Sequence, residues 1–453
     1  MFSGFPCGEY TLLSISLATA RLDFIVRRAS TSTESPSASL ERFVNPGDRV
    51  LLGTAAGAAL TLQAALNDQA ERLTDLHLVG GLQLGDYTFM DGVRAGTWRY
   101  DTWHVMASIR EDVASGLVGL HLVRGAAVPG LIRRLAPDVF LTSVSEPDAG
   151  GEVSFGASVS YALEALDHVP RVIAEINPGM PPTEGRTRVP VERFAGLVEA
   201  EQPLPTHTAG RRPPEAEGIA AHVRELIPDG ATVQIGLGAV PEALVESWTA
   251  APPPGLRVFG MGIDGMVPLL EKLGRPGSFV GGELLGTETL YDFARDNPLV
   301  EQYPIAEILA VRAVSAIPRF VSLTGALEVD LSGQINAEWA AGRQISGPGG
   351  GFDFIDAAGM SDGGLAITAL PSTFRRGERS TIVPRLAEDA PITVPRHSAQ
   401  VVVTEHGVAD LRGLTVAERA EAMIAIADPA MRDGLADSLP GAARGRPTDA
   451  VRG

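Results

Sequence analysis

The sequence predicts an α/β fold of two tandem, structurally similar domains, each with a mostly parallel sheet flanked by helices. Two segments about 180 residues apart, 45–66 and 227–248, share one pattern: a Pro/Gly turn, an apolar strand, a Gly-rich turn and an apolar helix. Around them, short apolar runs such as RVIAEI and QVVVT alternate with helical patterns such as GIAAHVRELI. This alternation is typical of parallel sheets whose connecting helices cover both faces. A repeat distance this long also excludes a solenoid.

Composition shifts along the chain predict the domain boundaries. Residues 1–40 include the Ser/Thr-rich stretch RRASTSTESPSASLER, which is typical of a flexible extension. The stretch EQPLPTHTAGRRPPEAEG (201–218) is rich in Pro, Gly and charge and is interpreted as a linker. The predicted domains are therefore 41–205 and 215–440, with the last residues frayed.

The charge of the chain argues against nucleic acid and anionic membranes as partners. The formal net charge is −18 at pH 7 and the sequence pI is about 4.9, so a polyanion would be repelled. No apolar run reaches the length that spans a bilayer, and no basic segment precedes the mildly apolar start as in a signal peptide. A cytoplasmic protein is expected.

Three residue counts restrict the chemistry. Cys7 is the single cysteine, so an intramolecular disulfide is impossible and a reducing compartment is expected. Lys272 is the only lysine, in the charged stretch LLEKLGRPG, so a Schiff base is excluded unless that residue forms it. The eight histidines lack the spacing of metal ligands, and no metal is predicted.

The turn GLGAVP (236–241) is the first candidate for a ligand site. Its pattern is G-x-G-x-x-P, and Asp264 lies too far downstream to act as the ribose-binding acid of a dinucleotide site. Gly236 and Gly238 would still let a ligand approach the backbone, and Pro241 fits the first turn of a helix whose free N–H groups favour anions. Tight strand–helix packing without a ligand explains these residues equally well.

Two further glycine patterns give weaker indications. GMSDG (359–363) resembles a nucleophile elbow around Ser361, but a helical stretch precedes it and a strand follows, which reverses the order that a serine hydrolase needs. GPGGGFDF (347–354) offers N–H groups with little bulk, which suits close approach of an extended ligand. A flexible hairpin explains the second pattern better when it is considered alone.

A series of motifs occurs in order over about residues 45–437. In the second half they are VQIGLGAVPEAL, LGTETLYDFARDNP, GALEVDLSGQIN, SGPGGGFDFIDAA, ALPSTFRRGERSTIVPRL and VVVTEHGVADLRG; in the first half they are GDRVLLG, GGEVSFGASVSYALEAL and VIAEINPGMPPTEG. Together they resemble the acetyl-CoA hydrolase/transferase family, which includes 4-hydroxybutyrate and butyrate–acetate CoA-transferases. Residues before 40 and the region 90–135 fit this resemblance poorly.

The resemblance implies tandem CoA-transferase-type domains and a CoA thioester as the ligand. In such enzymes a glutamate carboxylate attacks the acyl-CoA, and a mixed anhydride and then a glutamyl-CoA thioester form before an acceptor carboxylate, or water, reacts. The residues that would line CoA and the thioester carbonyl, where backbone N–H groups stabilise an oxyanion, are Gly236, Leu237, Gly238, Ala239 and Val240. Gly349 and Gly350 would flank the pantetheine arm, and Arg376 would stand near the CoA phosphates.

The nucleophilic glutamate of the family is missing from its usual place. The family has a segment of the form H-S-E-M before a D-G pair; here it reads LRVFGMGIDGM, with Gly260 at the position of the glutamate. Glu283, which follows an apolar strand and two glycines, is the predicted replacement, although an ordinary turn residue fits that pattern too. Glu405 in VVVTEHG is a further alternative, for which a supporting role fits better because the family keeps a glutamate there beside its nucleophile.

The sequence therefore predicts a short-chain acyl-CoA:carboxylate CoA-transferase or acyl-CoA hydrolase. Its partners would be acyl-CoA and a carboxylate, and a homodimer is expected from the family likeness. Residues 90–135 are expected to shape the acyl pocket. The alternative is a CoA-ester-binding homologue without glutamyl-thioester chemistry, because Gly260 cannot act as a nucleophile.

Overall fold

The computed structural model describes residues 35–208, 210, 212–374 and 377–439. Most of the predicted N-terminal extension lies outside these residues, as do Cys7 and Arg376. The first helix, α1 (Pro36–Phe43), begins inside the predicted extension and fully buries Leu40. The packed chain therefore begins before the boundary expected at residue 41.

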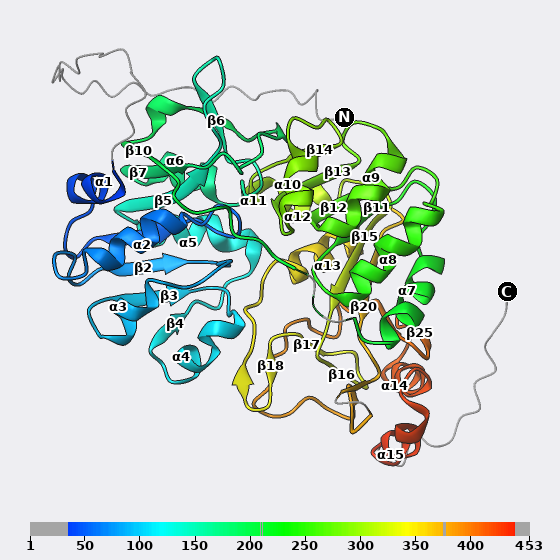
Figure 1. Ribbon diagram of the computed structural model, residues 1–453. Helices are drawn as coiled ribbons and strands as arrows, with labels where there is room; N and C mark the ends of the chain where they lie inside the picture. The colour runs from blue at the N-terminus through cyan, green and yellow to red at the C-terminus, as the bar shows by residue number, and fades with distance from the viewer. Residues whose placement is uncertain (1–34, 209, 211, 375–376, 440–453) are drawn as a thin grey trace, which may run out of the picture. The chain divides into compact units, whose positions relative to one another are not determined.

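The described residues form two large sheets, of seven and nine strands (Figure 1). In spatial order, the first contains β10 (Gly196–Glu199), β7 (Arg171–Ile176), β5 (Val139–Val144), β1 (Arg49–Leu52), β2 (His77–Gly80), β3 (Arg99–Thr102) and β4 (Val118–Leu120). The second contains β25 (Gly407–Asp410), β24 (Val401–Thr404), β20 (Leu365–Ala369), β15 (Phe320–Gly325), β11 (Thr232–Ile235), β12 (Arg257–Gly262), β13 (Phe279–Leu284), β14 (Val300–Gln302) and β8 (Glu184–Gly185). All neighbours pair in parallel except β24 and β25, so the prediction of mostly parallel sheets is confirmed.

Helices cover both faces of each sheet. The helices of the first half are α1, α2 (Leu60–Asp68), α3 (Met90–Arg94), α4 (Arg110–Ala114), α5 (Val128–Leu135) and α6 (Ala162–His168). Those of the second half are α7 (Glu215–Glu225), α8 (Ala239–Ala250), α9 (Val267–Leu273), α10 (Glu288–Ala294), α11 (Ile305–Ile308), α12 (Val311–Val314), α13 (Gly351–Met360), α14 (Val416–Ala425) and α15 (Arg432–Asp437). Within the described part, none is long and apolar enough to cross a membrane.

Smaller sheets of two or three strands extend from the loops. They are β6 (Glu152–Ser154) with β9 (Arg188–Pro190), β16 (Glu328–Asp330) with β17 (Ile335–Asn336) and β23 (Ile382–Val383), β18 (Trp339–Ala340) with β19 (Arg343–Gln344), and β21 (Thr373–Phe374) with β22 (Arg379–Ser380). The β18–β19 hairpin reaches the first half of the chain, where Arg343 pairs with Glu111 of α4.

The side-chain alternation of the strands explains why both faces need cover. On β12, Val258 belongs to the buried cluster that includes Val245 of α8, whereas Phe259 packs on the other face, its ring 6.1 Å from that of Phe354 in α13. Successive side chains of a strand point to opposite faces, so an uninterrupted apolar strand is stable only between two layers of helices.

Seven strands of each sheet follow one another in the same order. In both, the chain begins at a central strand (β1 or β11), adds three strands on one side and then three on the other. The turns after β1 and β11 belong to the two segments that the sequence identifies as a repeat. We therefore propose the two predicted domains, with the first beginning at α1 rather than at residue 41, although β8 from the first half closes one edge of the second sheet.

Candidate active site

A cavity of about 360 Å³ lies where the carboxyl ends of strands from the two sheets meet. The residues that follow β1 to β4 and line it are Thr54, Leu82, Trp103, His104 and Val123. The residues at or after the ends of β11, β12, β13 and β15 that line it are Gly236, Leu237, Gly260, Met261, Gly282, Glu283, Leu323, Thr324 and Gly325. Parallel sheets bind their ligands at this edge, at the strand where the chain reverses its direction of growth.

Glu283 faces this cavity from the end of β13 and is bonded to the first half of the chain. The Oγ atom of Ser158 lies 2.6 Å from Glu283 Oε2 and 2.8 Å from the carbonyl oxygen of Thr54. The backbone around both residues is fixed as well, since the amide of Leu284 donates to the carbonyl of Ala157 at 2.7 Å. A hydroxyl has one proton to donate, so a protonated Glu283 can donate to Ser158 while Ser158 donates to Thr54.

The environment of Glu283 favours this protonated form at neutral pH. Burial raises the pKa of Glu283 to about 8, although hydrogen bonds from Ser158 and Ser160 oppose the shift. A carboxyl group that titrates near the working pH, inside a cavity, is a frequent mark of an acid, base or nucleophile.

Gly260 lies beside Glu283 and cannot carry a side chain in this backbone. Its φ is +103°, a conformation that favours glycine, and a Cβ there would lie 2.9 Å from the carbonyl oxygen of Ile235. The pairing of β12 with β13 shifts register between Gly260 and Met261, which places Met261 opposite Glu283. The carboxylate that is absent from β12 therefore has a counterpart one strand away.

Two helix N-termini open toward the same cavity. Helix α8 begins after Gly236 and Leu237, and α13 begins at Gly351. Both N-caps, Gly238 and Gly350, are glycines, so neither has a side chain that could accept hydrogen bonds from the first N–H groups of its helix. Uncapped N–H groups and the positive end of the helix dipole favour a negatively charged or polarised oxygen.

Only some of the residues predicted to line CoA lie in the wall of this cavity. Gly236, Leu237, Gly349 and Gly350 line the cavity. Gly238 and Ala239 begin α8 outside the lining residues, while the Val240 side chain is buried in the core, which leaves its backbone alone for any ligand contact. The run at 347–354 is not a flexible hairpin, because its last four residues start α13.

Glu405 lies elsewhere. Its carboxylate accepts hydrogen bonds from the Ser372 amide at 2.9 Å and the Ser372 hydroxyl at 2.5 Å, and it is not among the described residues that line the cavity. Glu405 therefore fixes the turn before β21, as a supporting residue would. Ser361 follows α13 and precedes β20, as the sequence suggests, and its hydroxyl donates to the carbonyl of Ile317 rather than standing on a nucleophile elbow.

The segment 123–128 closes the cavity from the first half of the chain. The amide of Gly125 donates to the carbonyl of Gly349 at 2.8 Å, and the amide of Ala126 donates to buried Asp353 at 2.9 Å. Arg124 lies 3.0 Å from the same carboxylate. Within 90–135, the residues that line the cavity are Trp103, His104, Val123, Gly125 and Val128.

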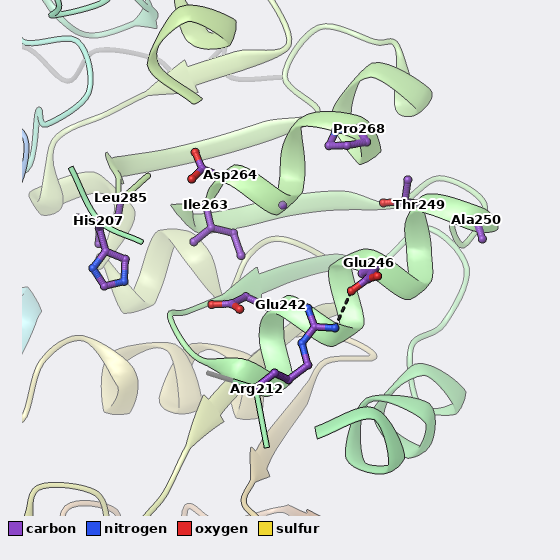
Figure 2. A pocket seen from close by; sticks show the side chains of 11 residues that line it. His207, Arg212, Glu242, Glu246, Thr249, Ala250, Ile263, Asp264, Pro268 and Leu285 are labelled. Atoms are coloured by element: carbon purple, nitrogen blue, oxygen red, sulfur yellow. Dashed lines mark hydrogen bonds and ion pairs between the residues drawn. The ribbon is translucent and has the colours of Figure 1, made fainter. Parts of the chain in front are cut away.

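A second hollow, of about 620 Å³, lies beside α8, which contributes Glu242, Glu246, Thr249 and Ala250 to its lining (Figure 2). Figure 2 shows Arg212 reaching Glu246, with the Glu242 carboxylate close by. Burial raises the pKa of Glu242, whereas Arg212 and His207 oppose the shift. Acidic groups outnumber the cations here, so this hollow suits the phosphates of CoA poorly. In the described residues, no group of His, Cys, Asp and Glu has the arrangement of a metal site.

Sequence reasoning missed the first-half residues that contact or face Glu283. Ser158 stands in the motif GGEVSFGASVSYALEAL, which carries the resemblance but gives no hint of a partner 125 residues away. His104 and Trp103 lie in the region where the resemblance is weakest. The one available signal was that both follow a strand, at the edge where ligands of parallel sheets bind.

Comparisons with known proteins agree with this architecture. A family model of the acetyl-CoA hydrolase/transferase C-terminal domain matches residues 286–439. The chain is 35% identical over 397 residues to the 4-hydroxybutyrate coenzyme A transferase of Clostridium kluyveri, covering 85% of this chain and 92% of that protein. It is 30% identical to the butyryl-CoA:acetate CoA-transferase of Anaerostipes caccae, over 87% and 93% of the two chains.

Solved structures extend the comparison to the fold. RipA from Yersinia pestis superposes with a TM-score of 0.83 at 27% identity, covering 90% of this chain and 96% of that chain. The 4-hydroxybutyrate CoA-transferase from Porphyromonas gingivalis gives a TM-score of 0.75 at 28% identity, over 89% and 96% of the two chains. The chain belongs to the acetyl-CoA hydrolase/transferase family of CoA-transferases and acyl-CoA hydrolases.

Proposed function

We propose that the protein is an acyl-CoA:carboxylate CoA-transferase that works through a glutamyl-CoA thioester on Glu283. The observation that carries the proposal is the position of this carboxyl group, in one cavity with Gly236, Leu237 and Gly260. If CoA bound at the uncapped start of α8, its thioester carbonyl would lie beside the Glu283 carboxylate.

The reaction requires the ionised form of Glu283. A carboxylate oxygen attacks the thioester carbonyl, the C–S bond breaks, and the thiolate of CoA leaves with the electron pair while a mixed anhydride forms. The thiolate then attacks the glutamyl carbonyl, and the first acid leaves as its carboxylate. An acceptor carboxylate reverses both steps and regenerates Glu283, so ping-pong kinetics follow.

The helix N-termini supply the electrostatic part of this chemistry. Each attack turns a carbonyl oxygen into an oxyanion, and we expect the N–H groups of the Gly236–Leu237 turn, which lines the cavity just before α8, to stabilise such charge. The hydrogen bond from Ser158 holds the carboxyl group of Glu283 in position, and Glu283 also lines the cavity.

Two observations support Glu283 over the alternatives. A glutamate at position 260 would need a different backbone, because the present φ and the nearby Ile235 carbonyl leave no place for a side chain. Glu405 is bonded to Ser372 away from the cavity. The relatives named for butyryl-CoA, acetate and 4-hydroxybutyrate support short acyl groups as substrates.

Hydrolysis is the related outcome when water replaces the acceptor. A relative from Neurospora crassa, 24% identical over 63% of this chain, is named acetyl-CoA hydrolase. A protein that binds CoA esters without turnover is the second candidate, since burial keeps Glu283 protonated at neutral pH and a protonated carboxyl is not nucleophilic.

Exchange of CoA between butanoyl-CoA and labelled acetate, at about pH 8.5, tests the proposal. Glu283→Gln keeps the size and the hydrogen bond of the side chain but removes the nucleophile, and we expect kcat to fall by at least about 1000-fold. Glu288→Gln is the matched control, since it makes the same change at an exposed position five residues later and should keep the wild-type rate.

If the Glu283→Gln variant exchanged CoA at the wild-type rate, the covalent role of Glu283 would be rejected. Binding of butanoyl-CoA without exchange or hydrolysis, in the wild-type protein, would instead support the binding protein. The expected homodimer and the cytoplasmic location stay predictions; light scattering of the purified chain decides the first.

A further inference from the structure

The loops after the strands of the first sheet supply one wall of the cavity, and at Trp103 and Gly125 this wall meets the glycine run 347–350. Gly236, Leu237 and the glycines at 349–351 all come from the second half of the chain. Glu283 stands between them and the first half, to which Ser158 ties it. If CoA lies along the second-half turns, as proposed above, the acyl tail beyond the reacting carbonyl must extend toward the carboxyl edge of the first sheet.

This edge is largely apolar. Leu82 and Val123 line it, and the ring of Trp103 packs edge-on against Tyr161 with 5.5 Å between ring centroids. The phenol of Tyr161 is already engaged, since it donates to the carbonyl of Leu52 at 2.6 Å. The polar side chains of the first half that remain for a tail are Thr54, His104 and Ser160, and Ser160 also hydrogen-bonds Glu283.

The lining residues that the structure describes include neither arginine nor lysine. Segment 123–128 contains one arginine, Arg124, and this residue is paired with the carboxylates of Asp353 and Asp356 at 3.0 and 3.5 Å. Burial lowers the pKa of His104 to about 4, so its imidazole carries no charge at neutral pH. A second carboxylate on the acyl tail would therefore be buried here without a counter-charge.

We propose that the site selects monocarboxylates with an uncharged, mainly apolar tail and rejects dicarboxylates, with His104 and the Trp103 wall as the specificity-determining residues. This inference rests on the proposed function. It follows from the chemistry of burial, because an isolated charge in an apolar wall costs far more than an apolar group of the same length.

Acceptor competition in the wild-type protein tests the selection directly. Butanoate, 3-methylbutanoate and succinate are compared as acceptors of CoA from acetyl-CoA at about pH 8.5. We expect kcat/KM for succinate to be at least about 100-fold below that for butanoate. Values within tenfold of each other would overturn the inference while leaving the CoA-transferase proposal intact, whereas exchange with none of the three acids would contradict the proposed function itself.

A charge placed on the wall provides the second test. His104→Arg adds a cation inside the cavity and should raise the succinate-to-butanoate ratio of kcat/KM by at least about tenfold. Leu122→Arg is the control, because Leu122 is 73% exposed and lies outside the lining of this cavity. An unchanged ratio in folded His104→Arg, or an equal rise in both variants, would contradict the placement of the acyl tail against His104.

Discussion

The two strand–turn–helix units that begin the sheets differ in what occupies the N-terminus of their helix. In the first unit, the amides of Thr61 and Leu62 at the start of α2 donate to Glu175 Oε2 at 3.0 and 3.3 Å. In the second, the start of α8 has no such carboxylate among the described residues, and the turn before it faces the cavity. The helix N-terminus of the first unit is therefore occupied by the Glu175 carboxylate, whereas no carboxylate of the described residues occupies that of the second.

The glycines of the two turns show the same contrast. A Cβ on Gly53 would clash with the carbonyl of Gly57, whereas a Cβ on Gly236 would meet nothing closer than the Gln234 side chain at 3.8 Å. The first glycine is required by packing and the second leaves space for a ligand. The same topology therefore contributes to stability at the Gly53 turn and to binding at the Gly236 turn. The residues around each turn determine which of the two roles it has.

Replacing Gly53 or Gly236 by alanine should produce the largest difference between the two units. Gly53→Ala forces backbone atoms apart, and we expect the free energy of unfolding to fall by about 3 kcal/mol or more. Gly236→Ala should change it by less than about 1 kcal/mol but lower kcat/KM for CoA transfer by about 10- to 100-fold, since the methyl group enters the ligand space. Urea unfolding and steady-state kinetics on both variants measure this. The reverse assignment of the two effects would break the comparison.

The carboxyl group of the first unit should control stability rather than catalysis. Burial raises the pKa of Glu175 to about 8, against the hydrogen bonds from Leu62 and Thr61. The folded state thus binds this proton more tightly than the unfolded chain, and the stability it contributes is complete below about pH 4.5 and is lost as the pH rises toward 8, at about 1.4 kcal/mol per pH unit.

Glu175→Gln should remove this slope and keep the rate of CoA transfer within about threefold. Because Glu283 contributes a slope of the same sign, urea unfolding between about pH 5 and 8 is compared in wild-type and Glu283→Gln backgrounds. A loss of activity in Glu175→Gln as large as that in Glu283→Gln would show that the two units do not differ in role.

The second unit should instead give catalysis a pH dependence. Since Glu283 reacts as a carboxylate and its pKa is raised to about 8, kcat/KM should rise about tenfold per pH unit below that value and level off above it. The pH–rate profile with butanoyl-CoA and acetate checks this. A profile that is already flat above about pH 5 would mean that the reacting group is not this buried carboxyl.

Ser158→Ala should produce the smallest effect. Its hydroxyl favours the ionised form of Glu283, so its loss should move the midpoint of the pH–rate profile upward by up to about one unit. Ser108→Ala, at an exposed position, should leave the midpoint unchanged. A lower rate without any shift of the midpoint would assign Ser158 a purely structural role.

The sequence predicts the architecture well because its signals are local. The repeat of turn, strand, Gly-rich turn and helix marks the central strand of each sheet, and continuous apolar runs such as VFLT and QVVVT mark strands buried on both faces. The start of the packed chain was placed too late, since the Ser/Thr-rich composition that predicts flexibility also contains Ser35, which caps α1, and Leu40, which the core buries.

The site depends on contacts that no local signal reports. The substitution at Gly260 is visible in the sequence, but the register shift that sets Glu283 beside it arises only when β12 and β13 pair. The bond from Ser158 to Glu283 joins residues 125 positions apart, across the two halves of the chain. His104 is one of eight scattered histidines until the first sheet places it on the cavity wall.

Peptide mapping by mass spectrometry, after incubation with butanoyl-CoA without an acceptor at about pH 8.5, tests the central claim most directly. The account predicts CoA attached through a thioester to the peptide that contains Glu283, and no adduct on that peptide in Glu283→Gln. Turnover of butanoyl-CoA with an adduct on a different glutamate, or with none under conditions that trap such thioesters, would contradict it.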